Sequence, residues 1–310
     1  MQKLPDKTVT AHSLPPSGAI AIYKGSAKKM PLQVPDVSLR LENEQVCYDF
    51  SADGTLIHAH DKEFDREILS GPGNLLSIYR DNPVTREAWD IDFYYRDEFE
   101  CNLECISAEK TAEGPLVSAI CLTYRYSSSR FVQQVSLRRG SKRLDFDTRV
   151  DWHEDRKMLR VAFPAAIIAD HANFDIASGW VRRSNHSNTS WERAQFEVSG
   201  HQFADLSDNG YGVALLNDCK YGYRVKDNTL ELCLLRSPKY PDFYADRGKH
   251  RFVYSLLPHE NALENSDVFA EAAELNRPPI LLNGFSIPDD FRTPCILQSR
   301  GIKSISLNNP

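Results

Sequence analysis

The feature that most constrains the fold is an alternation of apolar and polar residues with a period of two, which begins near Val37. Apolar side chains recur at Val46, Tyr48 and Phe50, and Asp53-Gly54, a strong hairpin-turn dipeptide, follows them. Strict alternation also runs through residues 144–152. Because successive strand residues point to opposite faces, such segments predict strands that bury one face. Joined by short turns, they predict an antiparallel meander.

The second half of the chain repeats this pattern. Residues 221–225 alternate, Asp227-Asn228 is typical of a turn, and leucines recur at positions 230, 232 and 234. Residues 252–256 predict a further strand. No alternation of strands with helices is present, which disfavours a parallel-sheet enzyme fold. We therefore expect an all-β fold, a large antiparallel β-sandwich.

The expected organisation has three parts. Residues 1–36 contain five prolines and predict an irregular N-terminal arm, in which residues 19–23 could form a short edge strand. Residues 37–282 predict the sandwich, with one helix near its end, at Ser266–Leu275. Ser266 is suited to cap that helix and Pro278 lies just past its end. Residues 283–310, with a strand-like stretch at 302–307, predict the start of a C-terminal β segment that the chain does not complete.

Composition excludes some classes of partner. The net charge is −6, which argues against nucleic acid, because phosphate binding needs a basic face. The longest apolar stretch, residues 161–169, is too short to span a bilayer, so we expect no membrane association. Residues 1–25 carry no apolar core of a secretion signal. Seven cysteines are an odd number for a disulfide framework, so we expect reduced, mostly buried thiols and a cytoplasmic location.

One local stretch is typical of a sugar site. Trp89–Glu100 (WDIDFYYRDEFE) places aromatic rings, which stack on sugar C–H faces, beside carboxylates, which accept hydroxyl protons. The alternative is a strand with an exposed acidic face.

The histidines do not predict a metal site. His58 and His60 would share one face of a strand, but they follow the Asp53-Gly54 turn, and an exposed hairpin arm explains them better. His153 and Asp155 have the spacing of some zinc ligands, yet they follow a strand end and predict a turn. No serine elbow or phosphate loop is present.

Several longer blocks carry a resemblance to a known family. They are NTSW at 188–191, ADLSDNGYGVALLNDCKYGY at 204–223, LLRSPKYPD at 234–242, ADRGKHRFVYSLLPH at 245–259, GNLLSIYRDNP at 73–83, AWDID at 88–92 and DWHEDRKMLRVAFP at 151–164. Along the chain they extend over most of the range 37–282. They resemble the C-terminal region of family 38 α-mannosidases of the type found in bacteria and in the eukaryotic cytosol.

The resemblance implies a galactose-mutarotase-like β-supersandwich. It also implies retaining, zinc-dependent hydrolysis of α-mannosides, with the zinc and the Asp nucleophile in an N-terminal catalytic domain. No segment of this chain matches those parts, so we expect no catalytic residue and no metal here, and a chain that is inactive alone. The implied partners are an α-mannoside and the catalytic domain, in cis or as a separate chain. An apolar patch exposed without that domain predicts self-association into a homo-oligomer.

The sandwich of the family contributes groups to the rim of the active site. By alignment Arg236 matches an active-site arginine, and Trp89, Asp90 and Asp92 lie near a tyrosine of the relatives. Asp205, Tyr211 and Tyr221 are further rim candidates, since glycines beside the two tyrosines would let a sugar approach. Two alternatives remain: a stand-alone carbohydrate-binding module, and a mutarotase-like epimerase. The epimerase would need His201 and Asp205 in one cleft.

Overall fold

The computed structural model describes residues 38–208 and 210–278, together with the backbone of four short strands. Those strands pair as β1 (Gln2–Lys3) with β2 (Thr8–Val9) and β22 (Ile296–Ser299) with β23 (Ile302–Ile305). The rest of the expected N-terminal arm, including residues 19–23, and most of residues 283–310 lie outside the described residues.

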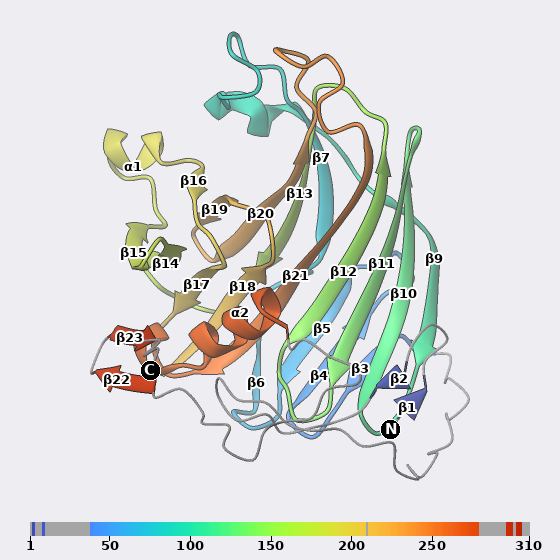
Figure 1. The fold of residues 1–310 in the computed structure, drawn as a ribbon, viewed down its shortest axis with the longest axis vertical. Coiled ribbons are helices and arrows are strands. Elements are labelled where there is room, and N and C mark those ends of the chain that lie inside the picture. The colour runs from blue at the N-terminus through green and yellow to red at the C-terminus, as the bar shows by residue number, and fades with distance from the viewer. Residues whose placement is uncertain are drawn as a thin grey trace, which may run out of the picture.

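Three antiparallel sheets make up the body of the protein (Figure 1). The nine-stranded sheet has the order β15 (Gly179–Ser184), β14 (His171–Ile176), β17 (Phe203–Ser207), β18 (Tyr211–Asn217), β21 (Gly248–Glu260), β12 (Leu144–Trp152), β11 (Ser129–Arg138), β10 (Val117–Tyr126) and β9 (Glu104–Ala112). The six-stranded sheet has the order β16 (Val198–Ser199), β19 (Gly222–Lys226), β20 (Thr229–Arg236), β13 (Lys157–Pro164), β7 (Leu75–Arg80) and β8 (Phe99–Asn102). The four-stranded sheet has the order β3 (Arg40–Glu42), β4 (Val46–Phe50), β5 (Leu56–Asp61) and β6 (Arg66–Glu67).

The prediction of an all-β antiparallel sandwich is confirmed. β12 buries every second residue, as its alternation predicted, and β11 and β12 form the expected hairpin around Gly140, whose positive φ of 70° suits a turn. The Asp53-Gly54 turn likewise joins β4 to β5. Period-two segments are thus the places where the sequence located strands correctly.

Aromatic side chains join the nine- and six-stranded sheets in the core. Phe146 of β12 stacks on Tyr254 of β21 with ring centroids 4.9 Å apart, and it packs at 5.6 Å against Phe163 of β13. The buried Tyr254 hydroxyl donates to Asn74 Oδ1 at 2.8 Å and accepts from Gln133 Nε2 at 2.7 Å. Because both partners are buried too, the Tyr254 hydroxyl has its hydrogen bonds satisfied inside the core.

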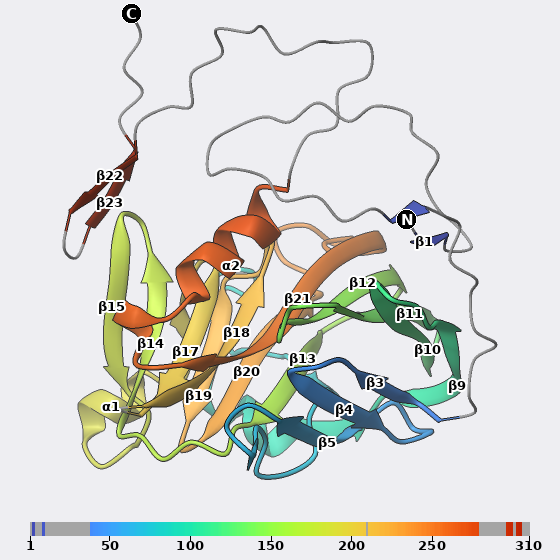
Figure 2. The ribbon, with the colours of Figure 1, turned by 90° about the horizontal axis from the view of Figure 1, so that it is seen from below.

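The predicted helix is confirmed as α2 (Val268–Asn276), which lies across the outer face of the nine-stranded sheet (Figure 2). Its Val268 and Ala272 pack with Phe203 and Leu216 of that sheet. The cap residue is Asp267 and not Ser266, although the Ser266 hydroxyl accepts from the Val268 amide. A second helix, α1 (Ser190–Ala194), is closed by a capping box that the sequence analysis missed.

The expectations about buried cysteines and membrane association can be compared with the described residues only. The six cysteines within them are free, but only Cys47 is buried and Cys219 is exposed, so the expectation of mostly buried thiols is wrong. In the same part of the chain, every helix is too short or too polar to cross a membrane.

Candidate functional site

Two loops at one end of the six-stranded sheet form a surface that we call the loop rim: residues 81–98, after β7, and 237–247, after β20. They stand beside each other at the top of Figure 1, in cyan-green and orange. Of the fifteen exposed large hydrophobic side chains in the described residues, seven lie here: Val84, Trp89, Phe93, Tyr94, Tyr240, Phe243 and Tyr244. An exposed apolar patch of this kind marks an interaction surface.

Residues 89–100 are not the exposed strand that one interpretation of the sequence offered. They form a loop that leads into the 3₁₀ helix η1 (Phe93–Glu98), and a strand begins only at Phe99. The Asp92 carboxylate closes this loop, because it accepts from the Val84 amide at 2.8 Å and from the Tyr94 hydroxyl at 2.5 Å. Side-chain acceptors of this kind compete with a β ladder for backbone N–H groups.

Arg236, at the end of β20, holds the first loop in place. Its Nε and Nη2 donate to the buried Asp81 carboxylate at 2.5 and 3.0 Å. Nη2 also donates to the carbonyls of Glu87 and Asp90, at 3.0 and 2.7 Å. Within the described part of the chain Nη1 makes no hydrogen bond, so it is the one donor nitrogen left for a ligand.

A backbone hydrogen bond joins the two loops, and charged pairs tie each loop to the turn between β12 and β13. The Glu87 carboxylate accepts from Arg156 and from the Lys239 backbone amide, both at 2.7 Å, and these bonds, that to Arg156 above all, hold the pKa of Glu87 below its ordinary value. Asp155 accepts from Arg247 at 2.6 Å and from the Lys239 ammonium at 2.9 Å, and its pKa is lowered for the same reason. The loops therefore present their aromatic rings from a cross-linked base.

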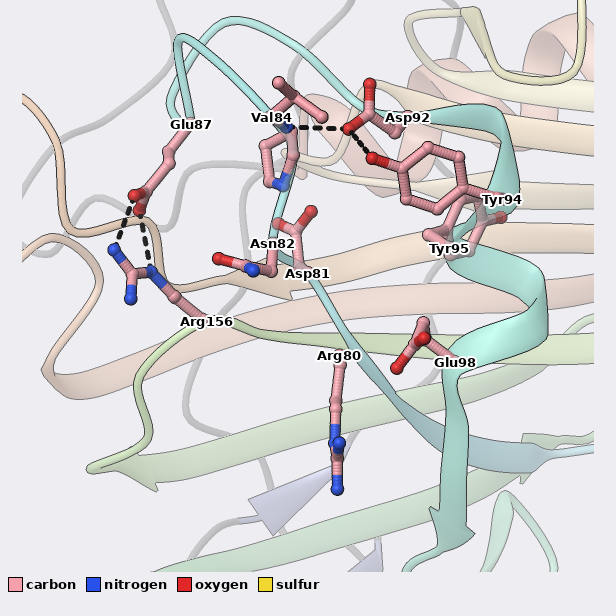
Figure 3. A pocket seen from close by; sticks show the side chains of 11 residues that line it. Arg80, Asp81, Asn82, Val84, Glu87, Asp92, Tyr94, Tyr95, Glu98 and Arg156 are labelled. Carbon is pink, nitrogen blue, oxygen red and sulfur yellow. Dashed lines mark hydrogen bonds and ion pairs between the residues drawn. The ribbon is translucent and has the colours of Figure 1, made fainter.

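A cavity of about 570 Å³ opens beneath the first loop (Figure 3). The Glu87–Arg156 pair lies on one side of it and Asp92 with Tyr94 on the other. Its lining includes Arg80, Asp81, Asn82, Pro83, Val84, Tyr95 and Glu98. The volume falls within the range of small-molecule sites. Carboxylates and tyrosine rings together suit a polyhydroxylated ligand.

A buried charged network supports η1 from below. The Glu231 carboxylate, 3% exposed, accepts from Arg224 at 2.6 Å, Arg96 at 2.8 Å and Arg160 at 3.1 Å. Burial raises the pKa of Glu231, but the three guanidinium groups together outweigh it and bring that pKa below the ordinary value. Since Arg96 belongs to η1, the network fixes this helix to the sheet.

Comparison with known proteins identifies the family. The family model described as "Glycosyl hydrolases family 38 C-terminal domain" matches residues 41–244, about two thirds of the chain. The chain belongs to glycoside hydrolase family 38. The matched region includes all of residues 81–98 and most of the second loop of the rim.

The relatives of this family 38 chain are much longer proteins. It is 37% identical to Alpha-mannosidase 2C1 of Homo sapiens over 255 residues, which cover 81% of this chain and 24% of that protein. It is 35% identical to Alpha-mannosidase G of Dictyostelium discoideum over 244 residues, which cover 76% and 22%. The chain thus spans about a quarter of the length of the curated relatives it matches.

A solved structure supports the supersandwich fold. The crystal structure of an alpha-mannosidase from Enterococcus faecalis V583 matches with a TM-score of 0.66 at 16% identity, covering 79% of this chain and 32% of that one. Such low identity speaks to the fold alone.

The loop rim of this family 38 domain brings together four of the seven sequence-predicted rim residues. Arg236 contacts the backbone of Asp90, Asp92 closes the loop, and Trp89 packs edge-to-face on Tyr240 with centroids 6.3 Å apart. Tyr221 is exposed but precedes β19, where its ring packs against His201. It belongs to neither loop of the rim.

Asp205 and Tyr211 are not rim residues, which corrects two predictions. Asp205 is fully buried and pairs with the buried His259, Nε2 to Oδ1 at 2.8 Å. Tyr211 is 2% exposed and donates to the buried Asp61 at 3.0 Å. Alternation along β17 and β18 could not reveal this, since both faces of these central strands are covered.

The structure also bears on the hypotheses about His201 and His153. His201 is exposed and does not meet Asp205, so the acid–base pair that an epimerase would need is not assembled. His153 pairs with Asp151 at 2.9 Å while Asp155 faces Lys239 and Arg247. The prediction of a turn between β12 and β13 is confirmed at these positions.

Sequence reasoning missed Asp81, Glu87 and the aromatic residues of the second loop. Their signal was present: RDNP at 80–83 and SPKYPD at 237–242 are turn sequences that follow strands. What was lacking was any indication that these two loops meet, as they do through Glu87 and Lys239, which are 152 residues apart.

Proposed function

We propose that this chain is the C-terminal β-domain of an α-mannosidase and that its loop rim borders the mannoside site of a separate catalytic domain. One observation carries the proposal: the family match includes the loops that expose seven large hydrophobic side chains next to carboxylates. The substrate class comes from relatives named as alpha-mannosidases.

The residues at the loop rim indicate which groups of the proposed site this chain supplies and which the catalytic domain supplies. In the described residues, groups of three close side chains of the types that ligate metals occur only on the four-stranded sheet, and none lies at the loop rim. The rim therefore does not fit a zinc site built on imidazole nitrogens. In the proposal the catalytic zinc and nucleophile belong to the catalytic domain, and the rim positions the sugar.

A reconstitution assay tests this proposal. Hydrolysis of an aryl α-mannoside would be measured with added zinc for the chain alone, for a family 38 catalytic domain alone, and for the mixture. We expect no turnover from the chain alone and a gain in the mixture. Turnover by the chain alone would contradict the proposal. Mannoside binding by the chain without any gain in the mixture would favour the stand-alone binding module instead.

Two tryptophan variants make the test local. Trp89→Ala removes a ring that is 68% exposed at the rim, whereas Trp191→Ala removes one that is 82% exposed on α1. Stacking on an aromatic ring contributes about 0.5–1.5 kcal/mol, so we expect W89A to weaken mannoside binding about two- to tenfold. W191A should leave it unchanged. Equal effects of the two variants would mean that the rim does not hold the sugar.

A cytoplasmic location is also part of the proposal. The free cysteines of the described residues support it, because disulfides are rare in reducing compartments.

A further inference from the structure

The outer face of the four-stranded sheet carries a cluster of imidazoles and carboxylates, at the end of the molecule opposite the loop rim (Figure 1). Strand register builds it: Asp49 of β4 lies opposite His58 of β5, and His60 of β5 lies opposite Glu67 of β6. Between the two histidines Ala59 points into the core, fully buried, so both imidazoles share the outer face.

Three of these side chains converge on one point. Glu67 Oε1 lies 2.9 Å from His58 Nε2 and 3.3 Å from His60 Nδ1, and the three side chains each offer one ligand atom within 4.8 Å of the other two. The two imidazole rings are parallel within 4°, with centroids 6.0 Å apart. Ligand atoms at about 2.0–2.1 Å from a tetrahedral zinc ion lie about 3.3 Å from each other. The two separations from Glu67 Oε1 need only a small expansion to accept such an ion.

The far nitrogen of each imidazole also has a carboxylate partner. His58 Nδ1 lies 3.2 Å from Asp49 Oδ2, and His60 Nε2 lies 3.4 Å from Asp65 Oδ1. Such a partner accepts the remaining N–H of a metal-bound imidazole, which fixes its tautomer and orients its lone pair toward the metal. Here both imidazoles then direct a lone pair to the side where Glu67 lies.

We propose that His58, His60 and Glu67 bind a divalent transition-metal ion such as Zn²⁺ or Co²⁺. Two imidazoles and a carboxylate are a donor set that suits these ions. The side chains of His58 and Glu67 are 43% and 49% exposed, so water completes the coordination. The bound ion would cross-link β5 to the two-residue edge strand β6.

Nearby charged residues bear on the alternative to metal binding, which is a set of histidine–carboxylate pairs without an ion. Arg40 Nη1 lies 3.6 Å from Asp49, which leaves Glu67 as the main anionic ligand, and Lys62 is engaged by Glu42. Without metal, the same distances describe imidazoles hydrogen-bonded to carboxylates on an exposed face. That arrangement predicts no metal affinity beyond that of an ordinary surface histidine.

Calorimetric titration of untagged, chelator-treated protein with Zn²⁺ separates the two. We expect one ion per chain, with at least a tenfold loss of affinity in His60→Gln and in Glu67→Gln. Asp49→Asn, which removes the negative charge beside His58 Nδ1 and leaves the three proposed ligands in place, should weaken binding about tenfold or more. The matched control is His153→Gln, since His153 also pairs with a carboxylate, Asp151 at 2.9 Å, but belongs to no group of three metal-ligating side chains among the described residues. It should bind as the wild type does.

Spectroscopy of the wild-type protein tests the same site without any substitution that could destabilise the fold. Long-range ¹H–¹⁵N spectra of the imidazoles should show Zn²⁺ perturbing the nitrogens of His58 and His60, most strongly the Nε2 of His58 and the Nδ1 of His60, and the nitrogens of no other histidine. Co²⁺ should give visible d–d absorption that Zn²⁺ removes. Absence of stoichiometric binding, or imidazole shifts at other histidines only, would overturn the proposal.

Discussion

Replacing Glu231 with glutamine tests whether the buried network beneath the loop rim stabilises the domain. Glu231 accepts three hydrogen bonds from guanidinium groups: one at Oε1, from Arg224, and two at Oε2, from Arg96 and Arg160. A glutamine amide offers one oxygen and one NH₂ group. Whichever way the amide turns, at least one guanidinium donor faces another donor.

The magnitude follows from these contacts. One lost hydrogen bond to a charged group costs about 1.5–3 kcal/mol. Loss of the negative charge also leaves Arg160, which is 1% exposed, without one of its two compensating carboxylates. Breaking a buried ion pair by removing one partner costs about 3–5 kcal/mol. We therefore expect E231Q to lower the free energy of unfolding by about 3–5 kcal/mol.

Urea unfolding followed by far-UV circular dichroism and by tryptophan fluorescence measures this change. The matched control is Glu104→Gln, since Glu104 accepts from Arg125 at 2.8 Å but both side chains are about 60% exposed. Exposed pairs contribute about 0–1 kcal/mol. If E231Q and E104Q lowered the free energy of unfolding equally, the reasoning about burial would be refuted.

The sign of the pH dependence offers a second check. The folded-state pKa of Glu231 lies below the ordinary value of 4.5, so its contribution to stability is fully present above that value. It is lost as the pH falls through the folded pKa. The difference in stability between the wild type and E231Q should therefore be largest near neutral pH and shrink below about pH 4.5. A difference that grows on acidification would contradict the lowered pKa.

Further variants test the core. Tyr254→Phe removes the hydroxyl between Gln133 and Asn74, and we expect about 1–3 kcal/mol of destabilisation in urea unfolding, because buried amides lose a partner; no change would mean that water replaces the hydroxyl. Gly212→Ala adds a methyl group that overlaps the His259 ring, so the free energy of unfolding should fall by about 1–3 kcal/mol. Gly210→Ala meets no atom within 4 Å and should stay within about 0.5 kcal/mol of the wild type; equal effects would refute the steric argument.

The loop rim was only partly predictable. Residues 89–92 were found because aromatic residues next to carboxylates stand out in a sequence, and Arg236 through the family resemblance. Asp205 and Tyr211 were misplaced because a central strand can be covered on both faces, and a polar residue there need not be exposed. The partner of Asp205, His259, lies 54 residues away, on β21. No local pattern encodes such a pairing.

The sequence by itself determined the antiparallel β class, most hairpins and the family, because strand alternation and turn chemistry are local properties and the matched blocks are long. Only the tertiary structure decided which side chains meet. Sheet order places β13 between β7 and β20, and so brings Asp81 to Arg236. The register of β4, β5 and β6 likewise brings Glu67 to His58 and His60, where the sequence alone favoured an exposed hairpin arm. Strand neighbours are set by packing of the whole sandwich, so chemistry built across strands becomes visible only once the chain is folded.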